Sequence, residues 1–99
     1  MNNQEKPLSE IIRTNIKKYR KIAKISQKEL GIMLKYEPSQ AQQRIYQYES
    51  GSRSPNKETI SMIANALRVS VEAIITENYE DKMVEMFKKA ISRKNQHIA

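Results

Sequence analysis

Apolar residues recur every three or four positions along most of the chain, which is the period of an α-helix with one buried face. The strict alternation of polar and apolar residues that marks a half-buried strand does not occur. Capping residues and turns divide the pattern into six predicted helices. Their approximate ranges are 8–23, 26–34, 39–49, 57–68, 71–75 and 80–92. We therefore expect an all-α fold.

The second predicted helix has a well-marked start. Ser26 can cap it, and Glu29 stands three residues later, which is the spacing of a capping box. Ile25 and Leu30 can pack around this cap as a hydrophobic staple. Gly31 lies inside the helix, where glycine costs roughly 1 kcal/mol relative to alanine. Such a cost is tolerated where another helix approaches closely, so we expect a steep helix crossing at Gly31.

The third predicted helix, residues 39–49, has two faces of different chemistry. Ser39 can cap its start, Gln42 stands at the capping-box spacing, and Gly51 stands where a helix stops. Its apolar stripe consists of Ala41, Ile45 and Tyr48. Its opposite face consists of Gln40, Gln43, Tyr46 and Gln47.

This opposite face carries amides and a phenol but no acid. A glutamine amide can donate and accept hydrogen bonds in a bidentate pair with adenine, so such a face can read base edges. A surface helix without that role more often carries Glu and Lys. The face therefore indicates a DNA-recognition helix, and the alternative is a neutral, solvated surface.

Composition and charge fit this interpretation. The 99 residues allow one domain, and 38% apolar residues suffice for a modest core. The net charge is +7, of which +5 falls within residues 1–38. A basic protein of this size suggests nucleic acid or an anionic membrane as a partner, although a solvated surface gives the same balance. No apolar run approaches the roughly 18 residues of a membrane span.

Candidate catalytic and metal-binding residues are few. The sequence has no cysteine, and His97 stands alone near the C-terminus, in a tail where we expect no order. Glu77, Glu80, Asp81 and Glu85 lack the spacing and the glycine of a calcium loop, so we interpret them as a solvated helix face. Phosphate loops, nucleophile elbows and zinc spacings are absent from the sequence. We therefore predict no enzymatic activity, no cofactor and no metal.

The ordered set of motifs resembles the helix-turn-helix domain of the Cro/cI-type (XRE family) regulators. The matching segments are 26–30 at the start of helix 2, 45–51 at the end of the recognition helix, Arg53 and Pro55 in the loop, and 56–75 in helices four and five. The resemblance covers about residues 8–76. It implies a five-helix lambda-repressor-like DNA-binding domain, to which this chain adds a C-terminal helix.

The resemblance also implies contacts with phosphates. Gln27 would bind a phosphate at the start of helix 2, where backbone N–H groups and the helix dipole favour an anion. Arg44 and Arg53 are also placed for phosphates. Arg20 and Glu49 match a pair that, in the family, ties helix 1 to the recognition helix.

For base contacts, the resemblance favours the start of the recognition helix. Gln42 and Gln43 would reach base edges there, and Gln47 would do so one turn later. The helical wheel instead places Gln40 outward and Gln42 on the flank. Tyr46 is either a base contact or a surface tyrosine.

The chain departs from the family between helix 2 and the recognition helix. From Leu34 to Gly51 it is about four residues longer and has no glycine in the turn. The recognition helix could start a turn early, or the extra residues could loop out, so the first glutamine to enter the groove stays open. Tyr36 in this segment either packs on the core or touches the DNA backbone.

The expected organisation is a disordered N-terminus at 1–7, a DNA-binding domain at 8–76, and a C-terminal helix with a frayed tail at 77–99. The predicted function is that of a transcriptional regulator, in the first instance a repressor, which binds double-stranded DNA as a homodimer on a palindromic site. Met83, Phe87 and Ile91 either supply the dimer surface or pack back onto the domain. The alternative is an antitoxin-like module whose C-terminal segment binds a partner protein. We expect a cytoplasmic protein that is associated with the nucleoid through DNA.

Overall fold

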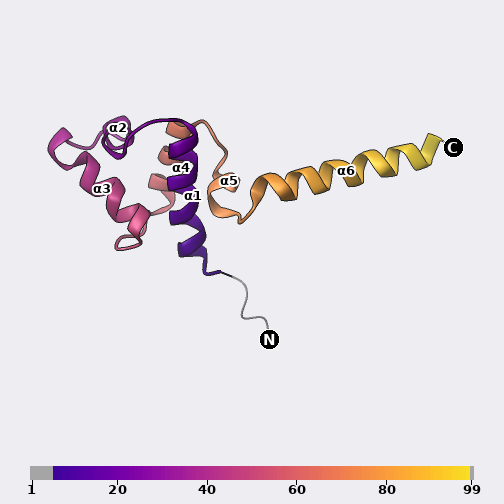
Figure 1. Ribbon diagram of the computed structural model, residues 1–99, viewed down its shortest axis with the longest axis horizontal. Coiled ribbons are helices and arrows are strands. Elements are labelled where there is room, and N and C mark those ends of the chain that lie inside the picture. Colours follow the sequence, from indigo (N-terminus) through magenta and orange to yellow (C-terminus); the bar gives the residue numbers. More distant parts are fainter. Residues whose placement is uncertain (1–5, 99) are drawn as a thin grey trace.

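The protein is described here by a computed structural model that covers residues 6–98, with side chains as far as Arg93. Its helices are α1 (Leu8–Ile22), α2 (Gln27–Met33), α3 (Pro38–Ser50), α4 (Lys57–Leu67), α5 (Val71–Ile75) and α6 (Tyr79–Ile98). The described part of the chain contains no strand, which confirms the all-α prediction. Helices α1 to α5 surround one core, and α6 projects from them (Figure 1).

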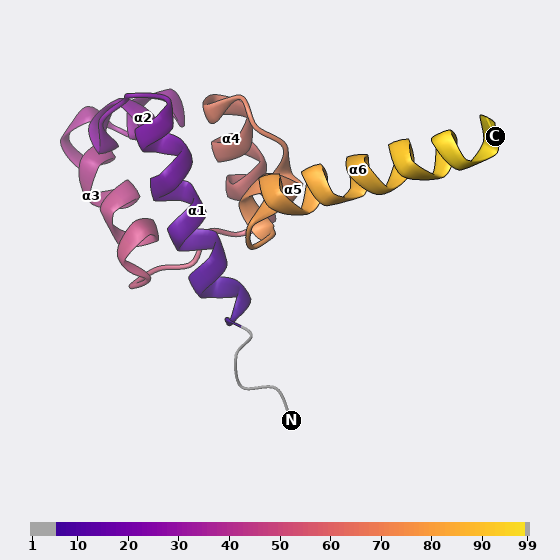
Figure 2. The ribbon, with the colours of Figure 1, turned by 45° about the vertical axis from the view of Figure 1, so that its right-hand side comes forward.

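The core draws on every helix of the five-helix domain. The largest fully buried side chains are Ile16, Leu30, Ile45, Ile63 and Ile74, one from each of α1 to α5. Each such burial stabilises the fold by roughly 1.5–3 kcal/mol. In Figure 2, α1 lies between α3 and α4, and it contacts both. Helix α1 therefore packs against both the recognition helix and α4.

Short polar residues begin three of the helices. The predicted capping box of α2 is confirmed: the Glu29 N–H donates to Ser26 Oγ at 3.0 Å, and the Ser26 N–H donates to Glu29 Oε1 at 2.7 Å. Asn56 caps α4 and Ser70 caps α5 in the same way. These bonds satisfy N–H groups that a helix start leaves without partners.

The predicted close approach at Gly31 is also confirmed. A Cβ atom added at Gly31 would lie 2.4 Å from the carbonyl oxygen of Ala41 and 2.7 Å from its Cβ. Only glycine lets the backbones of α2 and α3 meet at this distance. The helix-turn-helix crossing is therefore fixed by a residue without a side chain.

The predicted start of the recognition helix was wrong, because its N-cap lies two residues before Ser39. Glu37 is the N-cap and Pro38 occupies the first helical position, so Ser39 lies inside α3 and makes no capping bond. Proline suits this position because its fixed φ is helical and its missing N–H would have no partner there. Lys35, in the preceding turn, adopts a φ of 70°, the left-handed conformation that glycine often supplies.

A buried amide that the sequence did not indicate ties α1 to the end of α5. Asn15 Nδ2 donates to the carbonyl oxygens of Ala73, Ile74 and Thr76 at 3.2, 2.9 and 3.1 Å. The last carbonyls of a helix have no partner within the helix. Asn15 therefore satisfies the C-terminal end of α5 from inside the core.

Helix α6 leaves the domain after its first residues. Tyr79 packs on the core, and Glu80 accepts hydrogen bonds from Tyr19 of α1 and, at 2.9 Å, from Lys18 Nζ. Every side chain from Glu80 to Arg93 is exposed, so α6 does not pack back onto its own domain over this stretch (Figures 1 and 2). The helix extends beyond Arg93, where a frayed tail was predicted, and its backbone is helical to Ile98. This helical segment includes His97, whose side chain lies outside the described part.

The predicted disordered segment 1–7 falls largely outside the described residues. Of that segment, Lys6 and Pro7 are described. Lys6 Nζ lies 3.4 Å from a carboxylate oxygen of Glu77, just before α6.

Candidate nucleic-acid interface

The outward side of α3 presents polar, uncharged side chains to solvent. Ser39, Gln42, Gln43 and Tyr46 line one open hollow there, and Tyr46 is 53% exposed. Residues separated by three, four and seven positions share one side of a helix, which is why they meet. The single acid of α3, Glu49, is buried on another side. The hollow on the outward side of α3 thus brings together hydrogen-bond donors and acceptors, and α3 contributes no carboxylate to it.

The other two amides of α3 lie outside this hollow. Gln40 is exposed and Gln47 is half-buried. The carbonyl oxygen of Gln47 accepts a hydrogen bond from the Arg53 N–H at 3.2 Å, so the loop folds back along the end of α3. The structure therefore groups Gln42 with Gln43 and Tyr46, and leaves Gln40 to one side.

Arg20 and Glu49 join α1 to α3 in a nearly buried ion pair. Arg20 Nε and Nη2 donate to the two carboxylate oxygens of Glu49 at 2.6 and 3.1 Å. Arg20 Nη1 also donates to the Ile25 carbonyl at 2.9 Å. Gln27 Nε2, from the start of α2, donates to Glu49 Oε1 at 3.1 Å. One carboxylate therefore holds α1, α2 and α3 together, and it engages part of the Gln27 amide.

The turn between α2 and α3 supports Arg44. Tyr36 packs against the core, and its hydroxyl lies 2.9 Å from the Tyr48 hydroxyl. Burial, together with this hydrogen bond, raises the pKa of Tyr36 to about 12. The Arg44 guanidinium carbon lies 5.2 Å from the centroid of the Tyr36 ring, within the range of a cation–π interaction. Tyr36, in this turn, thus supplies an aromatic surface under Arg44.

Arg53 lies in the loop after α3, beside an arginine that the sequence analysis did not single out. Arg53 and Arg13 both line a hollow of about 230 Å³ whose other walls include Tyr48 and Gly51. Gly51 has a φ of 87° and ends α3. The stem of Arg13 lies so close that a Cβ at Gly51 would be 3.0 Å from its Cδ.

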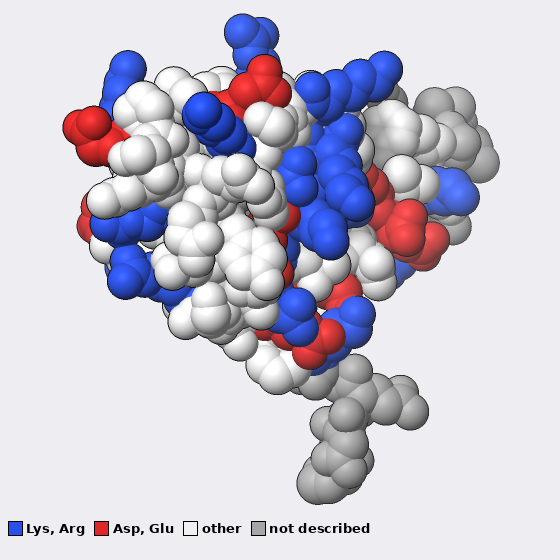
Figure 3. Space-filling view, turned by 60° about the vertical axis from the view of Figure 1, so that its left-hand side comes forward, with Lys and Arg blue, Asp and Glu red and all other residues white. Residues whose placement is uncertain are grey.

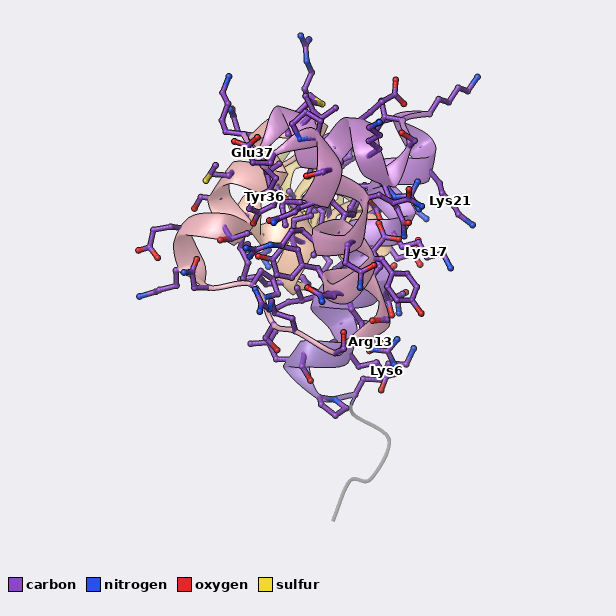
Figure 4. The ribbon with its side chains drawn as sticks, turned by 90° about the vertical axis from the view of Figure 1, so that its left-hand side faces the viewer. Lys6, Arg13, Lys17, Lys21, Tyr36 and Glu37 are labelled. Carbon is purple, nitrogen blue, oxygen red and sulfur yellow. The ribbon has the colours of Figure 1, made fainter. Side chains whose placement is uncertain are left out.

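The charges around α3 are unevenly distributed. Figure 3 shows an uncharged surface over α3 and, directly beside it, a patch of Lys and Arg over α1. In Figure 4, where α3 faces the viewer, Arg13, Lys17 and Lys21 follow one another along the edge of this face. Glu37, on the other side of the view, is an exposed acid at the start of α3.

Two crossing helices, of which the second exposes an amide-rich face next to basic residues, define a DNA-binding helix-turn-helix protein. The family model described as helix-turn-helix matches residues 16–74, which is more than half of the chain. The chain belongs to this family, and it is a Cro/cI-type (XRE family) DNA-binding transcription regulator. This is a regulatory family rather than a catalytic one. No curated protein and no solved structure matches the chain.

Membrane-spanning helices and metal-binding clusters are both absent from the described residues. In residues 6–98, no helix is both long and apolar enough to cross a membrane. Across the same part of the chain, His, Cys, Asp and Glu side chains form no group of three that could hold a metal ion.

Sequence reasoning missed several residues around this site. The roles of Arg13 and Glu37 depend on which helices neighbour them, and neither belongs to a local motif. Arg13 did leave one signal, because Arg13, Lys17 and Lys21 follow one another at a spacing of four. That spacing places them on one side of α1.

Proposed function

We propose that this protein is a sequence-specific repressor that binds the major groove of double-stranded DNA with α3, as a homodimer on a palindromic site. The observation that carries the proposal is the outward face of α3, where polar side chains are exposed together and the only acid of the helix is turned inward. An α-helix fits the major groove, and glutamine amides can pair with base edges there. A repressor needs no further chemistry, since an occupied site excludes other proteins.

Within this proposal, each side chain has a defined contact. Gln42, Gln43 and Tyr46 contact bases from the first turns of α3, and the flanking positions Gln40 and Gln47 complete the reading face. Phosphate contacts come from Gln27, Arg44 and Arg53. The cation–π contact with Tyr36 supports the role of Arg44, because it restricts the guanidinium before DNA arrives. Arg20 and Glu49 have a structural role, since they hold the three helices in register.

A homodimer follows from the limited reach of one helix. A single recognition helix contacts only a few base pairs, and two-fold symmetric proteins read half-sites about one helical turn apart. Helix α6 supports a dimer surface because Met83, Phe87 and Ile91 are 42%, 67% and 44% exposed on it. Exposed apolar side chains along one helix favour association. The protein would act in the cytoplasm, on the nucleoid.

Selection of bound sequences from a random duplex pool tests the reading face. We expect a site with two-fold symmetry, and Gln43→Ala should lower affinity by roughly 1–3 kcal/mol at particular base pairs only. Asn65→Ala, which removes an exposed amide from α4, is the matched control and should leave the site unchanged. Recovery of no preferred sequence, or of the same preference from Gln43→Ala, would contradict the assignment.

Sedimentation equilibrium tests the dimer. Wild-type protein should sediment as a dimer at micromolar concentration. Phe87→Asp should sediment as a monomer, because it puts a charge where the exposed Phe87 ring would be buried by the partner subunit. Lys89→Asp changes charge on the same helix away from the apolar side and is the control. A monomeric wild type that still protects a symmetric site would contradict a dimer that forms through α6 before DNA is bound.

A further inference from the structure

We propose that Arg13, Lys17 and Lys21, here called the α1 basic row, bind the phosphate backbone of the same DNA duplex that α3 reads. The inference rests on the DNA-binding function and extends the interface beyond the helix-turn-helix. None of the phosphate contacts assigned above comes from these three residues. The partner is the sugar–phosphate strand at the edge of the groove.

The α1 basic row is continuous. Its members stand four residues apart, so they lie on one side of α1 and extend over about 12 Å. Phosphates of one strand follow one another every 3.4 Å or so along the duplex axis. A row of this length can therefore meet more than one phosphate.

The row borders the reading face directly. The Arg13 stem touches Gly51, the residue that ends α3, and shares a hollow with Arg53. Next to Lys21 in the chain, Arg20 pairs with Glu49, and this pair fixes the orientation of α1 against α3. Figure 4 shows the row along the edge of the α3 face, and Figure 3 shows the resulting basic patch beside the uncharged surface. A duplex seated on α3 would pass next to these cations.

Among the described residues, the charges of the row have no acidic partner. Neighbouring cations are neutralised: Lys6 pairs with Glu77, Lys18 with Glu80, and Arg20 with Glu49. In the described part of the chain, no carboxylate oxygen lies within 4.0 Å of a side-chain nitrogen of the row. Like charges four residues apart destabilise a helix. An external polyanion is therefore the counterion that this arrangement fits.

The salt dependence of binding tests the row without knowledge of the operator. The probe is a 30-base-pair duplex of random sequence, and the triple variant is Arg13→Gln, Lys17→Gln and Lys21→Gln. Each lost phosphate contact should reduce the slope of log affinity against log salt by about 0.9. The slope of the triple variant should therefore be smaller by about 2 to 3, and its affinity at 0.1 M salt should be at least ~30-fold lower. Its base preference on a selected site should stay the same, since phosphate contacts carry no sequence information.

The control variant removes three positive charges from α6, by Lys82→Gln, Lys88→Gln and Lys89→Gln. Helix α6 projects from the domain away from α3 (Figure 1). The slope of log affinity against log salt for this control variant should therefore stay within about 1 of the wild-type slope. Circular dichroism checks the folding of both triple variants. The double variant Lys17→Gln, Lys21→Gln leaves the packed Arg13 in place and should still lose about 1.8 from the slope.

Three results would overturn the inference. The first is a wild-type slope in the α1 triple variant, and the second is an equal loss in the α6 control, which would reflect net charge alone. The third is a loss of binding to phosphatidylserine-containing vesicles with DNA binding unchanged, which would make a membrane the partner of the row. If wild-type protein bound no duplex in a salt-dependent way, the proposed function itself would fail.

Discussion

Replacing Arg20 with methionine should destabilise the domain strongly, because the change leaves a buried carboxylate without its charge partner. The Glu49 side chain is only 4% exposed, and that of Arg20 is 11% exposed. Arg20 supplies two of the three hydrogen bonds that Glu49 receives from side chains, and Gln27 supplies the third. Methionine fills much of the same space but donates nothing.

The expected magnitude is large for a domain of this size. Removing one partner of a buried ion pair typically costs about 3–5 kcal/mol. The whole free energy of unfolding of such a domain is about 5–15 kcal/mol. At roughly 4–8 °C for each kcal/mol, the midpoint of thermal unfolding should fall by at least ~12 °C. Arg20→Met should therefore be folded only marginally at 37 °C.

The double variant Arg20→Met, Glu49→Leu separates the ion pair from packing. Removing both charges together leaves no unpaired carboxylate. Two losses remain, at about 1 kcal/mol each: the Gln27 amide loses its acceptor, and the Ile25 carbonyl loses its donor. The double variant should thus be more stable than Arg20→Met alone. Urea unfolding followed by circular dichroism at 222 nm measures all four members of the cycle. A cost below 1 kcal/mol for Arg20→Met, or additivity of the two changes within about 0.5 kcal/mol, would refute the reasoning.

Three further changes test the fold and the base of α6. Gly31→Ala should cost about 2 kcal/mol or more in a urea melt, because the clash with the Ala41 carbonyl outweighs the gain of roughly 1 kcal/mol in helix propensity; an unchanged midpoint would contradict the close approach. Asn15→Leu should cost about 2–4 kcal/mol by the same assay, since the carbonyls of Ala73, Ile74 and Thr76 lose their donor; a neutral result would mean that water replaces it. The hydrogen bond from Tyr19, followed by that from Lys18, lowers the pKa of Glu80 to about 2, so the contribution of this contact is complete above pH 4.5 and is lost as the pH falls toward 2. Because the Glu80 side chain is half exposed, this contribution should stay below about 1 kcal/mol, and carbon-detected NMR of its carboxyl should show the low pKa in wild type and a higher one in Tyr19→Phe.

Most helices were predictable because their signals are local. The capping box at Ser26 and Glu29 lies within four residues, and the apolar stripes need only the helical period. Gly31 was informative for a related reason, since a glycine inside a helix is costly unless something approaches it. The amide face of α3 could also be predicted from the sequence, because its residues lie within two turns of one helix.

Contacts between distant segments were harder to predict. The three carbonyls that bind Asn15 are 58 to 61 residues away, and an asparagine inside a helix gives no local sign of such a role. The path of α6 was open for another reason. Its apolar and charged sides fit packing on the domain and packing on a partner equally well, and only the structure shows that residues 80–93 stay exposed to solvent.

The start of α3 shows how one turn changes the reading face. The sequence pattern predicted that Ser39 caps this helix. The turn instead places Lys35 in the left-handed region and Tyr36 against Tyr48, and Pro38 then sets the first helical φ. With Ser39 inside the helix, its side chain joins the hollow lined by Gln42, Gln43 and Tyr46 rather than capping the backbone. The start of α3 at Pro38 therefore lengthens the exposed polar face at its N-terminal end, which is the end that points into the groove in helix-turn-helix complexes.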